Sequence, residues 1–476
     1  MPRFSEYHQL ALTQRELDFV DVSTEFDTPV YVDPYAIEIR DDEWSASASE
    51  FIRSFFLAVL ESLRSGNNAR AVSLMSNLRE PSETFLGVSS GVPRGRGVGV
   101  KQAAQLIAAI RKSEAFKTGL LSDLSEMALY VEGIDRDKIS DLTTNIIRYL
   151  LVAYTKQQCD LFGIPVAEYA SPAGWDNEAK NWVAKYVELP FVDGQPVLLV
   201  PKHIVRRRLS LDSQEFYNKQ ITDFLVSEHL DANSSLVHTI KGGKERKVYK
   251  GDVRKEHPKS KAFIAEIVRK HPELLKTLKD LEKKSIGQQS FLSQDPSLFE
   301  VVDKIKSNLK EINPGKEDAD SYHKLAIASL TVLFYPNLIQ PKKEWEINQG
   351  RKRIDIVFTN AGNDGFFSQR RDDHNTHANF VIIEAKNFTN DIANTEIDQL
   401  LGRFDENRGR LGLLMCRALK DENTLWDRLR DAAVRKTGYI IPITDADITQ
   451  MLDAKLVGDE ETIEGMLHSK FRKLVS

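Results

Sequence analysis

Apolar residues recur at helical spacing through much of the first half of the chain. Three segments carry this pattern and predict amphipathic helices: 47–64, 101–113 and 140–162. Ser140 and Asp141 are residue types that cap helix N-termini, so the third helix is expected to begin there. Two short segments, 29–37 and 196–205, are rich in β-branched residues and predict strands. We therefore expect residues 1–290 to form a mainly helical N-terminal domain.

The pattern changes after residue 318 to an alternation of helices and strands. The expected helices are 320–335, 391–407, 422–437 and a short one from Asp445, and the expected strands are 343–349, 353–359, 379–388, 410–419 and 438–444. The order is helix, three strands, helix, strand, helix, strand. This order predicts an α/β domain with a mixed central sheet flanked by helices.

The boundary between these two regions is expected near residues 312–320. Proline and glycine stand together there and acidic residues follow, a composition typical of a break between compact units. The charge-rich helical pattern before it predicts a linker over residues 291–317. The chain thus divides into an N-terminal domain, 1–290, this linker, and a C-terminal domain, 318–476.

Composition narrows the class of protein. The 476 residues carry a formal net charge of only −5, so a uniformly basic nucleic-acid-binding protein is excluded, and any such contact must come from local patches. Cys159 and Cys416 lie in no metal-binding spacing, which argues against a structural zinc site and a disulfide framework. No apolar run approaches the ~20 residues that span a bilayer, and the N-terminus lacks a signal-peptide pattern. We expect a cytoplasmic protein.

Two of the predicted strands carry ionisable residues among apolar ones. Asp355 lies in the middle of RIDIVFT (353–359), where a buried acid is costly unless something compensates its charge. In the strand 379–388, Glu384 and Lys386 follow an apolar run and, being two positions apart, point to the same side. Neighbouring strands are therefore expected to bring these three side chains together.

This combination suits the hydrolysis of a phosphodiester. Mg²⁺ prefers carboxylate oxygens and retained waters, stabilises charge on the phosphate and promotes formation of hydroxide near neutral pH. Asp355, Glu384 and the main-chain carbonyl of Ala385 are the expected ligands, with Mn²⁺ as a substitute ion. Lys386 would place a positive charge beside the attacking water or the phosphate. The alternative is a buried salt-bridge network in a plain α/β domain, although such networks are rarely net stabilising.

The sequence Ile354-Asp355-Ile356, followed by Glu384-Ala385-Lys386, resembles the signature of the PD-(D/E)xK, or restriction-endonuclease-like, nuclease superfamily. In that family the next helix often carries a glutamine and, four residues later, an aromatic or basic residue; Gln399 and Arg403 stand in these places. The resemblance covers about residues 318–455 and includes the order of helices and strands. It implies a metal-dependent nuclease whose catalytic residues are Asp355, Glu384, Lys386 and Gln399.

One position departs from the family pattern. The family usually carries a glutamate on the first helix, where this chain has His323, with Asp320 one turn earlier and Glu317 before it. Glu344 or Glu346, on one face of the strand that precedes Asp355, could also supply the missing acid. His323 could ligate the metal or position a water. The number of metal ligands therefore stays open.

Polar and basic segments offer further contacts to a nucleic acid. The insertion between the strands that carry the candidate site contains Arg370, Arg371, His374 and His377. It is either a substrate-gripping loop or a mobile excursion. Three basic N-terminal segments, 91–101, 202–208 and 240–261, could contact phosphates or could be solvated charged surface.

We expect a Mg²⁺-dependent endonuclease acting on DNA and, by analogy with the superfamily, a restriction or phage-defence effector that forms a homo-oligomer. The N-terminal domain would sense the substrate or mediate oligomerisation. An RNA-directed nuclease of the same fold is an alternative, because the motif contacts phosphates rather than sugars. A non-catalytic nucleic-acid-binding or assembly protein on a degenerate nuclease fold is a third.

Overall fold

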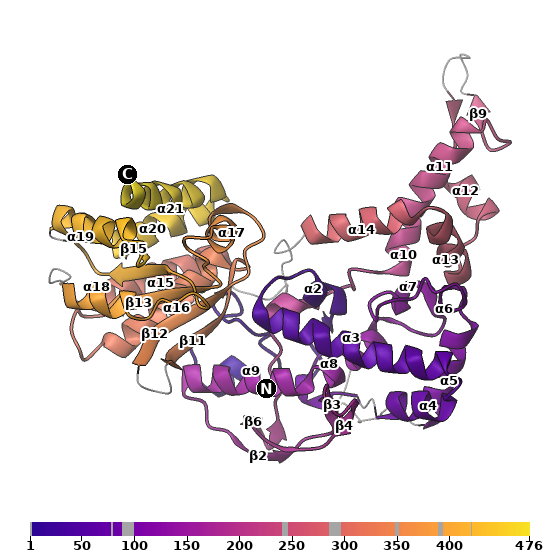
Figure 1. Ribbon diagram of the computed structural model, residues 1–476, viewed down its shortest axis with the longest axis horizontal. Coiled ribbons are helices and arrows are strands. Elements are labelled where there is room, and N and C mark those ends of the chain that lie inside the picture. Colours follow the sequence, from indigo (N-terminus) through magenta and orange to yellow (C-terminus); the bar gives the residue numbers. More distant parts are fainter. Residues whose placement is uncertain are drawn as a thin grey trace.

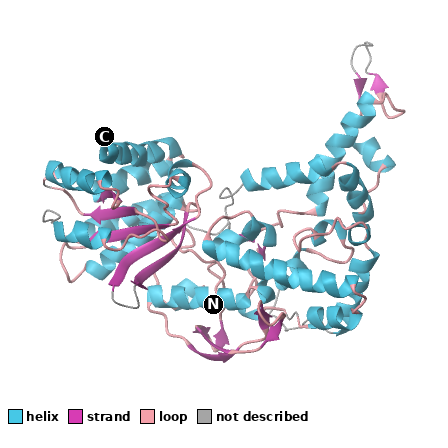
Figure 2. Cartoon of the chain, in the orientation of Figure 1, coloured by secondary structure: helices cyan, strands magenta, loops and turns pink. Residues whose placement is uncertain are grey.

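The computed structural model is a mixed α/β structure in which helices dominate and the largest sheet described lies in the C-terminal part (Figure 1, Figure 2). It describes residues 2–77, 80–87, 100–239, 246–284, 297–347, 352–388, 394–419 and 421–476. Buried apolar side chains form two clusters. The first draws its residues from Phe4 to Leu278, and the second from Leu161 and from Val301 to Leu474. Within the described ranges, every helix is too short or too polar to cross a bilayer.

The N-terminal part consists mainly of helices. They are α1 (Phe4–Tyr7), α2 (Pro34–Glu38), α3 (Glu43–Arg64), α4 (Asn68–Ser76), α5 (Val100–Lys112), α6 (Glu114–Lys117), α7 (Met127–Tyr130), α8 (Arg136–Ile146), α9 (Arg148–Phe162), α10 (Ser213–Phe216), α11 (Thr222–Asp231), α12 (Lys250–Glu256), α13 (Lys261–Lys270) and α14 (Pro272–Lys284). Two short 3₁₀ helices, η1 (Ser82–Thr84) and η2 (Lys202–Ile204), and one π-helix, η3 (Tyr217–Ile221), accompany them. The strands form two-stranded pairs: β1 (Tyr31–Val32) with β8 (Val205–Arg206), β2 (Ala167–Ala170) with β5 (Tyr186–Leu189), β3 (Gly174–Asp176) with β4 (Asn181–Val183), β6 (Phe191–Val192) with β7 (Gln195–Pro196), and β9 (His238–Thr239) with β10 (Arg246–Lys247). Helices α11 and α12 and the β9–β10 hairpin project from the body as an arm (Figure 1).

Helices α3 and α5 confirm the first two helices predicted from the sequence. The third prediction, one helix over 140–162, is wrong: the segment contains two helices, α8 and α9, that meet at Ile147. Ser140 and Asp141 lie inside α8 and do not cap it. The cap is Asp135, whose side chain accepts a hydrogen bond from the Lys138 N–H at 3.1 Å.

The two strands predicted over 29–37 and 196–205 are largely wrong. Within them, only Tyr31–Val32 and Val205–Arg206 pair with each other, while Pro196 ends β7. Pro34 begins α2, where its missing N–H is one that a helix leaves unbonded in any case. Asp33 caps this helix by accepting from the Tyr35 N–H at 3.0 Å. A capped proline start therefore overrides the β-branched composition.

The C-terminal part is built on a five-stranded sheet of order β11–β12–β13–β14–β15. Its strands are β11 (Leu338–Ile347), β12 (Lys352–Asn360), β13 (Phe380–Lys386), β14 (Leu411–Cys416) and β15 (Tyr439–Thr444), and its helices are α15 (Leu298–Glu311), α16 (Ala319–Phe334), α17 (Gly365–Asp372), α18 (Asn394–Leu401), α19 (Glu422–Val434), α20 (Asp445–Leu456) and α21 (Glu460–Val475). The pairs β11–β12 and β12–β13 are antiparallel, and β13–β14 and β14–β15 are parallel. The predicted mixed sheet flanked by helices is confirmed. Helix α21 was not predicted, and α18 is shorter than expected.

Helix α15 occupies part of the segment predicted as a linker. It buries Val301, Val302, Ile305 and Leu309 in the second cluster. Arg417, just after β14, donates to the carbonyl oxygens of Leu309 and Ile312 at 2.8 and 3.0 Å. These contacts join the end of α15 to the sheet.

The insertion between β12 and β13, expected to be either a substrate-gripping loop or a mobile excursion, includes a packed helix. It contains α17, whose Phe366 and Phe367 are buried in the second cluster. The guanidinium of Arg370 lies 4.2 Å from the centre of the Phe471 ring. Two adjacent phenylalanines thus anchor a segment that is otherwise polar, and His374 remains exposed at its surface.

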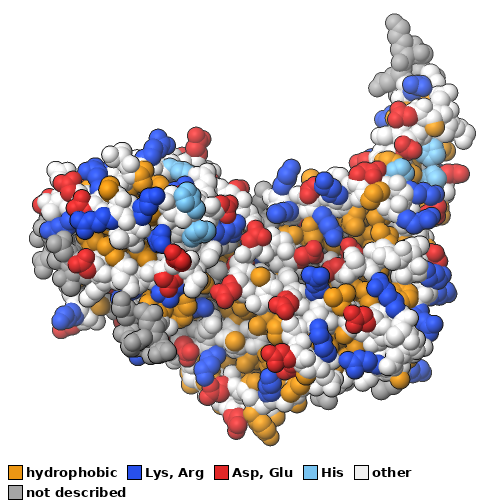
Figure 3. Space-filling view, in the orientation of Figure 1, with side chains coloured by type: hydrophobic (Ala, Val, Ile, Leu, Met, Phe, Trp, Pro, Cys, Tyr) orange, Lys and Arg blue, Asp and Glu red, His pale blue; other side chains and the backbone are white. Residues whose placement is uncertain are grey.

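The N-terminal part contacts the edge strand β11. Helix α9 packs against this strand, and the Gln340 N–H donates to the Asp18 carboxylate at 3.0 Å. Gln340 lies in a bulge of β11 and has a positive φ of 52°. The N-terminal part therefore covers a sheet edge that would otherwise be open to pairing. On the face shown in Figure 3, acidic and basic side chains are interspersed, in keeping with the small net charge.

Candidate active site

Asp355 and Glu384 lie side by side on neighbouring strands. The β12–β13 pairing sets Ile356 opposite Ile383 and Val357 opposite Ile382. One step further along the same register, Asp355 faces Glu384. Because side chains alternate between the two faces of a sheet, opposite residues share a face, and Lys386 lies on the face of Glu384.

Cationic groups join these acids into one cluster. The Lys386 Nζ lies 2.5 Å from Glu384 Oε1. Arg403 follows α18 and contacts both acids: its Nη1 pairs with Glu384 Oε2, and its Nη2 lies 3.5 Å from Asp355 Oδ1. The structure therefore brings Asp355, Glu384, Lys386 and Arg403 together.

Burial raises the free-energy cost of holding the charges of this cluster away from water. Glu384 is fully buried, whereas about a quarter of the Asp355 side chain is exposed, 24%. Burial lowers the pKa of the Arg403 guanidinium, and the negative charge of Asp355 opposes that shift. A buried carboxylate of this kind needs cationic partners, because an unpaired charge in the interior costs several kcal/mol. Lys386 and Arg403 supply them, and the opening at Asp355 leaves a route for solvent and ions.

Packing around Phe404 positions Arg403. A Cβ atom at Gly438 would lie 2.3 Å from Cε2 of the Phe404 ring, and one at Gly412 would lie 2.9 Å from its Cζ. Glycine at these two positions, one in β14 and one just before β15, leaves the space that the ring fills. The neighbouring guanidinium is then directed at the two acids.

The main-chain carbonyl of Ala385 is also engaged. The Nε2 atom of His323, on α16, lies 3.0 Å from this oxygen. A carbonyl oxygen only accepts, so His323 is the donor, and its Nε2 is not available as a metal ligand in this arrangement. The carbonyl keeps a second lone pair for another partner.

The acids considered for the third carboxylate are held elsewhere. Asp320 pairs with Lys343 and Lys324, contacts that lower its pKa. Glu344 and Glu346 pair with Arg353 at 3.6 and 2.8 Å, and Glu317 is exposed. Among the described residues, no three His, Cys, Asp or Glu side chains are arranged to hold a metal. The donor set at the site is thus two carboxylates and a main-chain carbonyl, which fits a Mg²⁺ ion that keeps several waters.

Gln399 lies on α18 with its side chain exposed, and no contact joins it to the four clustered residues. Nothing in the sequence pattern had pointed to Asn387, which also lies beside the site. It is buried just after Lys386, and its Nδ2 donates to the carbonyl oxygens of Asn313 and Gly315, both at 2.9 Å. It thereby ties the loop before α16 to the end of β13.

The three basic segments of the N-terminal part differ in how far the structure describes them and in the exposure of their side chains. Residues 91–99 and 240–245 lie outside the described residues. In the segment 202–208, Lys202, His203 and Arg206 are buried, so these three form neither the expected surface patch that tracks a nucleic acid nor a solvated charged face. Arg208 is exposed and pairs with Glu215 at 2.8 Å.

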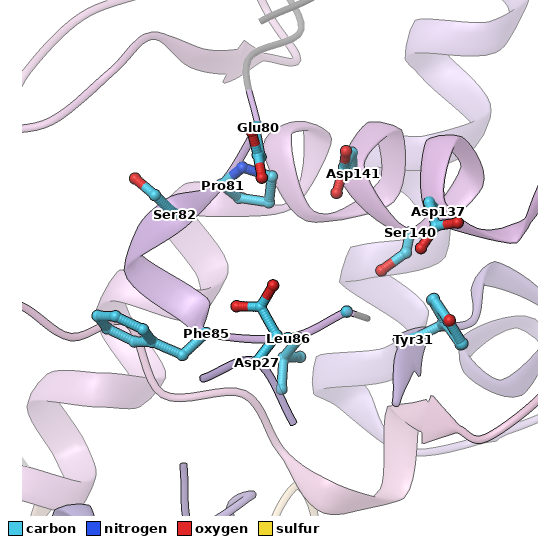
Figure 4. A pocket seen from close by; sticks show the side chains of 11 residues that line it. Asp27, Tyr31, Glu80, Pro81, Ser82, Phe85, Leu86, Asp137, Ser140 and Asp141 are labelled. Carbon is cyan, nitrogen blue, oxygen red and sulfur yellow. The ribbon is translucent and has the colours of Figure 1, made fainter. Parts of the chain in front are cut away.

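A separate acidic cavity of about 280 Å³ lies in the N-terminal part. Figure 4 shows the carboxylates that line it: Asp27, Glu80, Asp137 and Asp141. Burial raises the pKa of Asp141 to about 7, and the negative charges of Glu80 and Asp137 add to this shift. These acids belong to a region distinct from the β12–β13 site.

Comparison with known proteins gives one match. A family model described as a domain of unknown function, DUF8370, matches residues 9–212. No curated protein and no solved structure matches the chain. The matched residues end well before Asp355, so this similarity concerns the N-terminal part and not the cluster on β12 and β13.

Proposed function

We propose that the protein is a metal-dependent endonuclease of the PD-(D/E)xK type that hydrolyses phosphodiester bonds in DNA. The observation that carries this proposal is the cross-strand placement of Asp355 and Glu384, with Lys386 at 2.5 Å from Glu384. Two acids and a lysine on one face of a sheet are costly as a purely structural device. They are useful where a cation and a phosphate must be held together.

Asp355, Glu384 and the carbonyl of Ala385 would hold Mg²⁺ or Mn²⁺. When bound, the ion supplies charge stabilisation on the phosphate and an acidified water. Lys386 places its ammonium beside the acids, where it stabilises negative charge on the phosphate. Arg403 neutralises both carboxylates in the arrangement described. With a metal ion bound to these acids, its guanidinium would be available to the phosphate.

The proposal is tested with full-length protein on supercoiled plasmid DNA. Cleavage is expected with Mg²⁺ or Mn²⁺ and is expected to stop with a chelator. Asp355→Asn and Lys386→Met are each expected to lower the rate by about 10²–10³-fold, the loss typical of a charged group that acts on the transition state. Glu346→Gln, an exposed acid of the adjoining strand, is the control and should cleave normally. Wild-type rates in Asp355→Asn would refute the site.

One observation favours a second function, a non-catalytic nucleic-acid-binding or assembly protein. Arg403 already neutralises both acids, and the part of the chain that the structure describes offers no third carboxylate. Calorimetric titration with Mg²⁺ and Mn²⁺ separates the two functions. Absence of both uptake and cleavage would favour the non-catalytic protein, and uptake that Asp355→Asn weakens would favour the nuclease.

The proposal extends to the setting of the enzyme. We place it in the cytoplasm as a homo-oligomeric restriction or defence effector, since paired nuclease sites cut both strands of a duplex. Parallel digestion of matched DNA and RNA substrates decides between DNA and RNA. Cleavage confined to RNA would replace the DNA substrate while leaving the site assignment in place.

A further inference from the structure

A cluster of cationic side chains is enclosed where the N-terminal part meets the C-terminal part. Arg40 follows α2, Lys202 and His203 lie in η2, and Arg206 lies in β8. Their exposed fractions are 4%, 3%, 0% and 6%. From the C-terminal side, Tyr335 closes the cluster, with the Lys202 ammonium 4.3 Å from the centre of its ring.

Several polar nitrogens in this cluster have no hydrogen-bond partner. In the ranges that the structure covers, these are Nε and Nη1 of Arg40, both ring nitrogens of His203 and Nε1 of Trp44. The Trp44 ring lies 5.9 Å from the His203 ring, so it borders the same enclosure. A buried unsatisfied donor costs about 1–3 kcal/mol, and more when it is charged. Native proteins rarely leave several such groups in one place.

The neighbouring carboxylates do not provide the missing acceptors. Asp18 accepts from the Gln340 N–H at 3.0 Å and from the Tyr154 hydroxyl at 2.8 Å. Asp42 uses one oxygen to cap α3, by accepting from the Ser45 N–H at 2.9 Å. Asp18 and one oxygen of Asp42 are therefore engaged by neutral donors, while Asp42 Oδ2 and the Nε and Nη1 atoms of Arg40 are left without a hydrogen bond among the described residues.

The cations of the cluster repel one another, and the carboxylates of Asp18 and Asp42 offset part of this repulsion at Arg40. Burial lowers the pKa of His203 well below its ordinary value, and the positive charges of Arg40, Arg206 and Lys202 lower it further. His203 is therefore neutral near pH 7, with one nitrogen that donates and one that accepts. An anion in the enclosure would relieve this repulsion and accept several hydrogen bonds at once.

We propose that this cluster is a binding site for a phosphate-type oxyanion. Guanidinium groups match the geometry and charge of phosphate oxygens, and charge-assisted bonds of this kind are stronger than neutral ones. A buried water could satisfy one or two of the donors, but it brings no negative charge. The observations therefore favour an anion over water.

The adjoining cavity provides room for a larger ligand. It has a volume of about 960 Å³ and includes Tyr335 in its lining. Its charged lining residues are Lys283, Lys284, Lys455, Asp280, Asp364, Glu460 and Glu464. Of the cluster residues, its lining includes Tyr335 but not Arg40, Lys202, His203 or Arg206. The proposed anion is therefore either free phosphate or the phosphate group of a nucleotide, and the titration below distinguishes the two. Free phosphate and a nucleotide phosphate group would offer the same kind of negatively charged oxygen atoms to Arg40.

Arg40, Lys202, His203 and Arg206 all fall within residues 9–212, the segment that the family model matches. None of them belongs to the cluster on β12 and β13. The proposed anion site can therefore be tested, and rejected, independently of the proposed nuclease site.

Calorimetric titration of the full-length protein tests the site. Inorganic phosphate, AMP and ATP are titrated separately, and sodium chloride at matched ionic strength is the reference. Saturable binding of at least one of the three is expected, and Arg40→Met should weaken it at least tenfold. Arg64→Met, an exposed arginine at the end of α3, should leave the Kd unchanged. Binding of a nucleotide without binding of phosphate assigns the anion to a nucleotide, and equal affinity for all three assigns it to free phosphate.

Thermal unfolding separates a binding role from a structural one. Arg40→Met removes a buried charge that has open hydrogen-bonding capacity, so its melting temperature without ligand should equal or exceed that of the wild type. The rise in melting temperature caused by ligand should disappear. His203→Phe is a second variant, since neither ring nitrogen bonds a described residue. No binding of phosphate, AMP or ATP by the wild type, or an unchanged Kd in both variants, would overturn the proposal.

Discussion

The imidazole of His323 lies with Nε2 at 3.0 Å from the main-chain oxygen of Ala385. Because that oxygen accepts, the proton must reside on Nε2, and a helix residue thus fixes the peptide between Glu384 and Lys386. His323 is therefore a positioning residue rather than a metal ligand. It stands at the place where the nuclease superfamily of the proposed function usually carries a glutamate.

His323→Ala is expected to lower metal-dependent cleavage by about 10–100-fold, because loss of a supporting hydrogen bond leaves the peptide between the two site residues free to shift. The concentration of Mg²⁺ that gives half-maximal cleavage should rise with it. His323→Gln, whose amide can donate in a similar place, should recover part of the activity. Equal losses in the two variants would contradict this role.

Arg403→Met is expected to destabilise the metal-free protein by about 3 kcal/mol, because it removes one of two cations that compensate the buried Glu384. Chemical denaturation checks this value, and added Mn²⁺ should restore part of the lost stability. Arg353→Met is the matched control. That side chain is 60% exposed and pairs with Glu346, so its loss should cost less than about 1 kcal/mol. Equal costs would mean that Glu384 does not depend on Arg403.

Gly438→Ala is expected to disturb the site from a distance. The added methyl group would collide with Phe404, and moving that ring displaces Arg403 beside it. We expect a loss of about 1–3 kcal/mol in stability, as for other overpacked positions, together with slower cleavage. Gly465→Ala, in α21 with nothing within 4 Å of the added atom, should be harmless in both assays. Normal cleavage by Gly438→Ala would show that the position of the Phe404 ring does not determine the position of Arg403.

Asp141→Asn is expected to stabilise the protein at alkaline pH. The pKa of Asp141 is raised from 3.8 to about 7, so the folded state holds a proton that the unfolded state has released between these values. Stability contributed by this carboxyl is therefore full below pH ~4 and falls as the pH rises toward 7. At pH 8 the variant should gain about 4 kcal/mol over the wild type, and at pH 4 the gain should vanish. A pH-independent difference in denaturation would exclude this titration.

The central part of the candidate site was accessible from the sequence because strand periodicity is local. Alternation within the strands predicts an inward acid at Asp355 and places Glu384 and Lys386 on one side, and the register of β12 with β13 then sets Asp355 opposite Glu384. The sheet and most of its helices follow from the same kind of pattern. Within a strand, face and neighbours are set by residues close in sequence.

Other features depend on contacts between distant segments. The position of Arg403 follows from Phe404 packing into space left by Gly412 and Gly438, which no local pattern encodes. Lys202 and His203 have the composition of a basic surface patch, yet both are buried. Lys202 lies over the ring of Tyr335, more than 130 positions away along the chain, and His203 lies against Trp44. The start of α2 at Pro34 was missed for a local reason, because the cap at Asp33 outweighed the β-branched composition. The break at Ile147 carries no side-chain cap, so no local signal of that kind marks it.

The hydrogen bond from Gln340 to Asp18 bears on how this protein can be dissected. It joins the outermost strand of the sheet to the N-terminal part at a bulge, two strands away from Glu384. A fragment that begins at α15 would leave this amide without its carboxylate and would uncover the side of β11 that α9 protects. Such a fragment would expose the unpaired main-chain groups of β11 and would be prone to self-association. Its behaviour would therefore say little about the intact chain.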